Sequence, residues 1–148
     1  MGGYQVVVVG TDGSDSSLRA VDRAGQLASG PGAKLIVASA YIPVPEDTRA
    51  ADMLKDEGYK IAGNAPIYDT LREARERAEA AGASAVEERA IEGAPVDALV
   101  ELAEEVGADL LVVGNVGMNT IAGRLLGSVP ANVARRSKSD VLIVHTSN

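Results

Sequence analysis

Residues 5–17 read QVVVVGTDGSDSS, and this stretch decides the fold. The β-rich run from Gln5 to Val9 predicts a short strand, and Gly10–Gly13 predicts the turn that ends it. Ser14–Ser17 offers several side chains that can cap a helix. Apolar residues then repeat at helical spacing, at Leu18, Val21, Ala24 and Leu27. The stretch therefore predicts a strand, a turn of small residues and a helix, in that order.

The same alternation continues to the end of the chain. Further strands are expected at 35–41, 86–91, 109–113 and 140–145, and further helices at 66–81, from 95 and at 128–136. The strand at 86–91 is polar enough to lie at an edge. Because crossovers between parallel strands are right-handed, this order predicts an α/β protein of one domain, residues 1–148. Its open sheet is mostly parallel, with helices on both faces.

The segment Ile42–Ala65 interrupts this regularity. Pro43 and Pro45 exclude regular structure at its start, and Ala50–Lys60 has room for a short helix. Only from about Pro66 is the helical pattern clear. Insertions of this length are often binding loops or lids, so its role stays open.

Composition excludes several classes of function. The 148 residues include no Cys, Phe or Trp, so there is no thiolate metal site, and the core is built from aliphatic side chains. The formal net charge of −7 and the few aromatic residues argue against nucleic acid as a partner. No apolar run is long enough to span a membrane, and no signal-peptide pattern is present, so we expect a cytoplasmic protein.

The segment between the fourth strand and the last helix carries the functional signal. There is no Gly-Lys-Ser or Gly-Lys-Thr and no Gly-x-Gly-x-x-Gly after a strand, which excludes two familiar nucleotide motifs. Instead Gly114 and Gly117 are followed, after nine residues, by Gly127 and Ser128. Glycines let backbone approach a phosphate, and the amides up to Val129 begin a helix that can face an anion. Each of these glycines, taken alone, is more simply explained as a turn residue than as part of a binding site.

This spacing, Gly-x2-Gly-x9-Gly-Ser, resembles the nucleotide motif of the universal stress protein family. The likeness extends over the whole chain, through the stretches VVVGTDGS, ADLLVVG, LLGSV and DVLIV. The resemblance implies a Rossmann-like sheet of order 3-2-1-4-5, usually in a dimer. It also implies that the motif binds ATP or a related adenine nucleotide.

By the same resemblance, residues at or just after the ends of three strands form the nucleotide site. Asp12, beside Gly10 and Thr11, is expected to contact the ribose or adenine, although an Asx-turn or helix-cap role is equally open. The backbone of Ala40 is expected to read the adenine edge. Phosphate and ribose oxygens are assigned to the motif residues, and Val113 lines the same pocket. The residues assigned to phosphate and ribose are Gly114, Gly117, Gly127, Ser128 and Val129.

The charge of the motif bears on the choice of nucleotide. Many ATP-binding relatives carry a basic residue after the second motif glycine, where this chain has Met118. Within the nine-residue spacer only Arg124 is cationic. A triphosphate brings close to four negative charges, which backbone amides hold poorly without a cation or Mg²⁺. Cyclic AMP or AMP is therefore a serious rival to ATP, and Mg²⁺ is expected only with ATP.

Catalysis is the weaker interpretation. His145 is the only histidine, and Ser128 has no base at a recognisable spacing. Three hypotheses remain: a nucleotide-binding sensor or buffer, a slow ATPase, and an interaction protein that needs no ligand.

The last strand predicts a homodimer. Its run Val141-Leu142-Ile143-Val144 is too apolar for a bare sheet edge, and pairing two such edges across a two-fold axis covers both.

Overall fold

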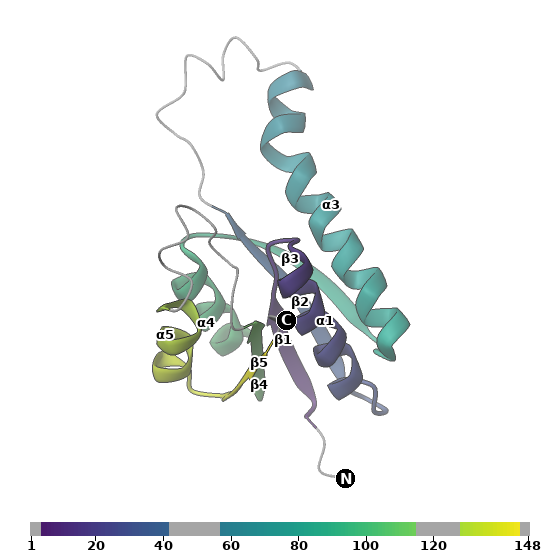
Figure 1. Ribbon diagram of the computed structural model, residues 1–148, viewed down its shortest axis with the longest axis vertical. Helices are drawn as coiled ribbons and strands as arrows, with labels where there is room; N and C mark the ends of the chain where they lie inside the picture. Colours follow the sequence, from purple (N-terminus) through teal and green to yellow (C-terminus); the bar gives the residue numbers. More distant parts are fainter. Residues whose placement is uncertain (1–3, 42–56, 115–127, 146–148) are drawn as a thin grey trace.

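Five strands lie side by side in the computed structural model, which describes residues 4–41, 57–114 and 128–145 (Figure 1). They are β1 (Val6–Gly10), β2 (Lys34–Tyr41), β3 (Val86–Glu92), β4 (Leu110–Gly114) and β5 (Asp140–Val144). Their order is β3-β2-β1-β4-β5, and every neighbouring pair is parallel. The expected open sheet of order 3-2-1-4-5 is confirmed, with the polar strand β3 at one edge.

Helices cover both faces of the sheet, as the alternation predicts (Figure 1). They are α1 (Asp15–Leu27), α3 (Glu57–Ala81), α4 (Pro95–Val106) and α5 (Ser128–Arg136). The helices α1 and α3 pack on one face and against each other, while α4 and α5 lie together on the other face.

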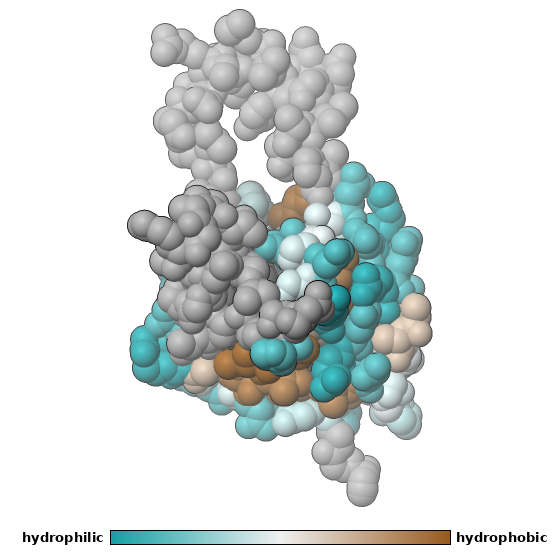
Figure 2. Space-filling model, in the orientation of Figure 1, coloured by the Kyte–Doolittle hydropathy of each residue, from teal (hydrophilic) through white to brown (hydrophobic). Residues whose placement is uncertain are grey.

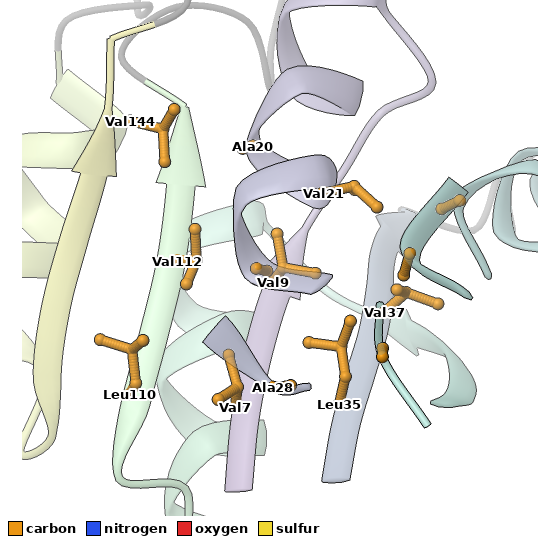
Figure 3. Packing of buried hydrophobic residues seen from close by; sticks show 14 of the residues in the cluster. Val7, Val9, Ala20, Val21, Ala28, Leu35, Val37, Leu110, Val112 and Val144 are labelled. Atoms are coloured by element: carbon orange, nitrogen blue, oxygen red, sulfur yellow. The ribbon is translucent and has the colours of Figure 1, made fainter. Parts of the chain in front are cut away.

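Alternate residues of the central strands pack against the helices on opposite faces of the sheet. Val7 and Val9 of β1 are fully buried under α1 and α3, beside Leu35 and Val37 of β2 (Figure 3). Val8 points the opposite way, into the cluster that α4 and α5 cover. Side chains in a strand alternate between faces, so one continuous apolar run fills both layers of a parallel sheet.

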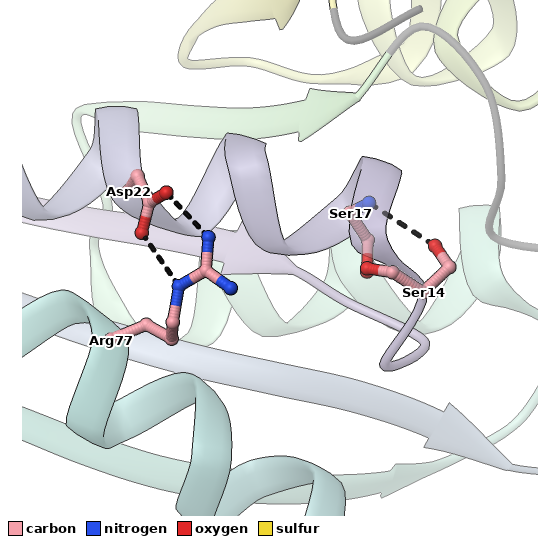
Figure 4. Close-up of polar contacts among 4 residues, drawn as sticks. All are labelled: Ser14, Ser17, Asp22 and Arg77. Carbon is pink, nitrogen blue, oxygen red and sulfur yellow. Dashed lines mark hydrogen bonds and ion pairs between the residues drawn. The ribbon is translucent and has the colours of Figure 1, made fainter.

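The contact between α1 and α3 depends on one glycine. A Cβ placed on Gly25 would lie 2.7 Å from the backbone oxygen of Ala78, closer than real Cβ contacts allow. The absence of a side chain at this position therefore lets the two helices approach. Beside this contact, Arg77 of α3 pairs with Asp22 of α1 (Figure 4).

The helix expected from about Pro66 begins earlier, at Glu57. A proline inside a helix removes one amide donor and crowds the carbonyl four residues before it, so it is more typical of a first helical turn, and for this reason the local pattern does not predict helix before Pro66. The C-terminal part of the segment Ile42–Ala65 is thus helical. Residues 42–56 of that segment lie outside the described residues.

Candidate functional site

The candidate site lies at the carboxyl ends of β1 and β4, which are neighbours in the sheet. From β1 the chain turns to α1 on one face, and after β4 it continues to α5 on the other face (Figure 1). The terminal residues of the two strands, Gly10 and Gly114, are both buried. The strand order reverses at this point, and in open α/β sheets such a switch point is where ligands bind.

Two buried hydroxyl groups organise the turn between β1 and α1. The side-chain oxygens of Thr11 and Ser17 lie 2.7 Å apart, in residues that are 1% and 0% exposed. Thr11 Oγ1 accepts a hydrogen bond from the amide of Gly13 at 3.0 Å, and Ser17 Oγ accepts one from the amide of Asp12 at 3.3 Å. The amide of Thr11 itself donates to the carbonyl oxygen of Ala38 in β2, at 2.9 Å.

The carboxylate of Asp12 closes the same turn. Its Oδ1 accepts a hydrogen bond of 2.9 Å from the amide of Ser14, the Asx-turn geometry that the sequence leaves open for this residue. Ser14 then caps α1, since its Oγ accepts a 3.1 Å bond from the amide of Ser17 (Figure 4). The amides of residues 12, 13 and 14 are therefore all engaged within the protein. This turn presents an exposed carboxylate rather than a row of amides for a phosphate.

The register of β2 fixes the direction of the Ala40 backbone groups. Lys34 and Ala38 form hydrogen bonds on the β1 side of the strand. The N–H of Lys34 donates to the carbonyl oxygen of Gln5, and the carbonyl oxygen of Ala38 accepts from the N–H of Thr11. Tyr41 bonds the opposite way, its carbonyl oxygen accepting from Gly93, which follows β3. Backbone groups alternate along a strand, so the N–H and C=O of Ala40 point toward the β1 side. The paired part of β1 ends opposite Ala38, before this point.

The β4 side of the site is described only in part. Val113 is fully buried and packs in the layer under α4 and α5. Ser128 and Val129 open α5, whose last residue, Arg136, forms a 2.7 Å ion pair with Asp97 of α4. The other predicted motif residues, Gly117 and Gly127, lie outside the described residues, as do Met118 and Arg124. The structure thus brings Gly10, Thr11, Asp12, Ala40, Val113 and Gly114 to the carboxyl ends of neighbouring strands.

Sequence reasoning missed the role of Ser17. It treated the serines of residues 14–17 as interchangeable caps, whereas the structure gives the cap to Ser14 and buries Ser17. A signal was present, because Ser17 precedes Val21 by four residues and so shares the buried stripe of α1. Within residues 4–41, 57–114 and 128–145, no three His, Cys, Asp or Glu side chains gather as a metal site would require. None of the helices described there is long and apolar enough to cross a membrane.

The sheet order and the small-residue segments at its switch point define a Rossmann-like α/β protein. The sequence pattern of the universal stress protein family matches residues 3–145, so this chain belongs to the universal stress protein family. It is 72% identical to universal stress protein Rv1636 of Mycobacterium tuberculosis over 147 residues, which cover 99% of this chain and 100% of that protein.

Two solved structures of relatives contain adenine nucleotides. A universal stress protein in complex with cAMP is 68% identical, with a TM-score of 0.76, and the match covers 98% of this chain and 99% of that one. The universal stress protein from Archaeoglobus fulgidus in complex with dAMP is 26% identical, with a TM-score of 0.66. That match covers 95% of this chain and 97% of the other.

Proposed function

We propose that this protein binds an adenine nucleotide, cyclic AMP in preference to ATP, and acts as a sensor or buffer of it rather than as an enzyme. The observation that carries the proposal is the 68% identical universal stress protein whose crystal structure is a complex with cAMP. The match covers 98% of this chain, so it includes every segment that forms the candidate site.

In this proposal, backbone groups of β2 recognise the adenine base by hydrogen bonding. The N–H and C=O of Ala40 point to the side on which β1 has ended, and together they offer one donor and one acceptor. The Watson–Crick edge of adenine carries the complementary pair, an acceptor at N1 beside a donor at N6. In the same orientation of the base, guanine presents a donor at N1 and an acceptor at O6, the reverse of adenine, so the N–H and C=O of Ala40 disfavour it.

The sugar and the phosphate lie on different sides of the switch point. The exposed carboxylate of Asp12 accepts a hydrogen bond from a free ribose hydroxyl, which in cyclic AMP is the 2′-hydroxyl, and it repels phosphate. The amides of residues 12–14 are engaged within the turn and do not compete for the phosphate. We therefore assign the phosphate, as the family resemblance implies, to Gly114, Gly117, Gly127, Ser128 and Val129. Arg124 is the only cation in the spacer of that motif, and cyclic AMP carries a single negative charge. We therefore favour cyclic AMP over ATP.

We also propose a homodimer through β5, in which each subunit covers the exposed edge of the other. This strand is the outer strand on its side of the sheet, and Ile143 is 40% exposed. A groove of about 440 Å³ adjoins it, lined by Tyr4, Leu27, Leu110, Asp140, Val141 and Leu142. Figure 2 shows the hydrophobic surface over β4 and β5. Proteins normally protect an apolar edge of this kind, and a two-fold copy does so symmetrically.

Isothermal titration calorimetry tests the nucleotide proposal. We expect cyclic AMP and AMP to bind and the guanine analogues, cyclic GMP and GMP, not to bind. Gly117→Val should abolish binding and leave the circular dichroism spectrum unchanged. Gly30→Val is the matched control, because a Cβ at Gly30 meets nothing within 4 Å, at the opposite end of β2. Unchanged affinity in Gly117→Val would refute the assigned loop, and turnover of ATP with Mg²⁺ would refute the non-enzymatic role.

A further inference from the structure

The hydroxyl group of Ser17 has every hydrogen-bonding capacity filled. Its proton goes to the carbonyl oxygen of Ser14 at 3.0 Å. A serine hydroxyl has only one proton, so in the 2.7 Å contact Thr11 must be the donor and Ser17 the acceptor. The amide of Asp12 supplies the second bond that Ser17 accepts.

These bonds tie one buried atom to three residues of the turn. Thr11 Oγ1 accepts from the amide of Gly13, so the pair of hydroxyls holds the amides of both Asp12 and Gly13. Gly13 has φ +86°, a conformation that L side chains rarely adopt and that fixes the direction of the following chain. The turn that carries the exposed carboxylate is thus held from inside, by a side chain that is itself fully buried.

We propose that Ser17 is a positioning residue for nucleotide binding: it holds the Asp12 backbone so that the carboxylate is placed for the ribose before the ligand arrives. The inference rests on the proposed function, in which Asp12 contacts the ligand. A contact group held in its bound geometry loses less conformational freedom on binding, so preorganisation raises affinity without touching the ligand. Ser17 acts only through the turn.

Ser17→Ala removes the acceptor of the Asp12 amide and leaves the helix residue otherwise similar in size. We expect the affinity for cyclic AMP, measured by calorimetry well below the unfolding temperature, to fall by about tenfold. Amide hydrogen exchange measured by NMR should accelerate at Asp12 and Gly13 in the free protein. The control is Asp22→Asn, which loosens α1 by breaking its ion pair with Arg77 and leaves the turn intact. Its affinity should stay within about twofold of the unmodified protein.

A second comparison separates positioning from a general loss of stability. In an Asp12→Ala background, Ser17→Ala should weaken binding no further, because both changes remove the same contact. The inference would be overturned if Ser17→Ala bound cyclic AMP with normal affinity. It would also be overturned if Ser17→Ala reduced the affinity as much in the Asp12→Ala background as in the unmodified protein. The proposed function would stand in both cases. Failure of the unmodified protein to bind cyclic AMP, AMP or ATP would overturn both.

Discussion

Arg77 of α3 and Asp22 of α1, which are 55 residues apart in the sequence, form a two-pronged ion pair (Figure 4). Its Nη2–Oδ2 distance is 2.6 Å and its Nε–Oδ1 distance is 3.1 Å. The hydrogen bonds to Asp22 raise the pKa of the Arg77 guanidinium above its ordinary value. The pair links the two helices of one layer beside the close approach at Gly25.

Breaking this ion pair should lower stability measurably. We expect Asp22→Asn to reduce the free energy of unfolding by about 1 kcal/mol, at the upper end for exposed pairs because both prongs are formed. Urea unfolding with an unchanged m-value is the measurement. The control is Asp69→Asn, which removes an ion pair with Arg72, three residues away on the same helix. The side chain of Asp69 is 65% exposed and that of Arg72 is 57% exposed. That variant should change stability by less than about 0.5 kcal/mol, and equal losses in the two would contradict the prediction.

The link between β2 and β3 should make stability depend on pH. Lys34 hydrogen-bonds Glu87 at 2.7 Å and holds the pKa of that carboxyl below its ordinary value of 4.5, with a smaller contribution from Arg89. A group whose pKa is lowered by folding stabilises the native state above its unfolded pKa. That contribution is lost as the pH falls through the folded pKa. We therefore expect stability to decrease between about pH 5 and pH 3, and less steeply in Lys34→Met.

Lys138→Met provides the comparison for this pH profile, because its ammonium lies 4.0 Å from Glu104 and is highly exposed. Its profile should follow that of the unmodified protein. Identical acid profiles for Lys34→Met and Lys138→Met would contradict the assignment to Glu87.

The scarcity of cations in the motif predicts a preference for little phosphate charge. We expect cyclic AMP to bind at least about tenfold more tightly than Mg²⁺-free ATP, a difference of about 1.4 kcal/mol. Met118→Lys should narrow the gap by helping ATP more than cyclic AMP. Competition binding at fixed ionic strength is the measurement, since salt weakens exposed charge contacts. If ATP binds more tightly to the unmodified protein, with or without Mg²⁺, the charge argument fails and family membership is unaffected.

The exposed position of Ile143 makes the proposed dimer easy to test. Its side chain is 40% exposed, so Ile143→Lys should shift the protein toward monomer at micromolar concentration without unfolding it. Light scattering measures the mass, and circular dichroism checks the fold. Glu101→Lys, at an exposed position of α4, is a control for the added positive charge and should leave the mass unchanged. A monomeric mass for the unmodified protein would rule the dimer out.

Local pattern alone was enough to predict the strands and their environment. The Val-rich run of β1 and the apolar run of β4 predict buried strands, and the charged β3 predicts an edge. These features depend on residues close in sequence, as helical spacing and turn residues do. The start of α3 is the exception. The helical pattern is clear only from about Pro66, but the helix begins earlier, at Glu57.

The sequence by itself determined the class of fold, the family resemblance and the strand ends at which the candidate residues stand. Tertiary structure decided which groups each residue meets there. Only the packing of α1 on the sheet buries Ser17 and brings its hydroxyl to Thr11. Only the register of β2 against β1 places the backbone of Ala40 beyond the paired end of β1. The physical reason is that a side chain's propensity acts over a few neighbouring residues. Hydrogen-bond direction and burial depend instead on parts of the chain that meet only after folding.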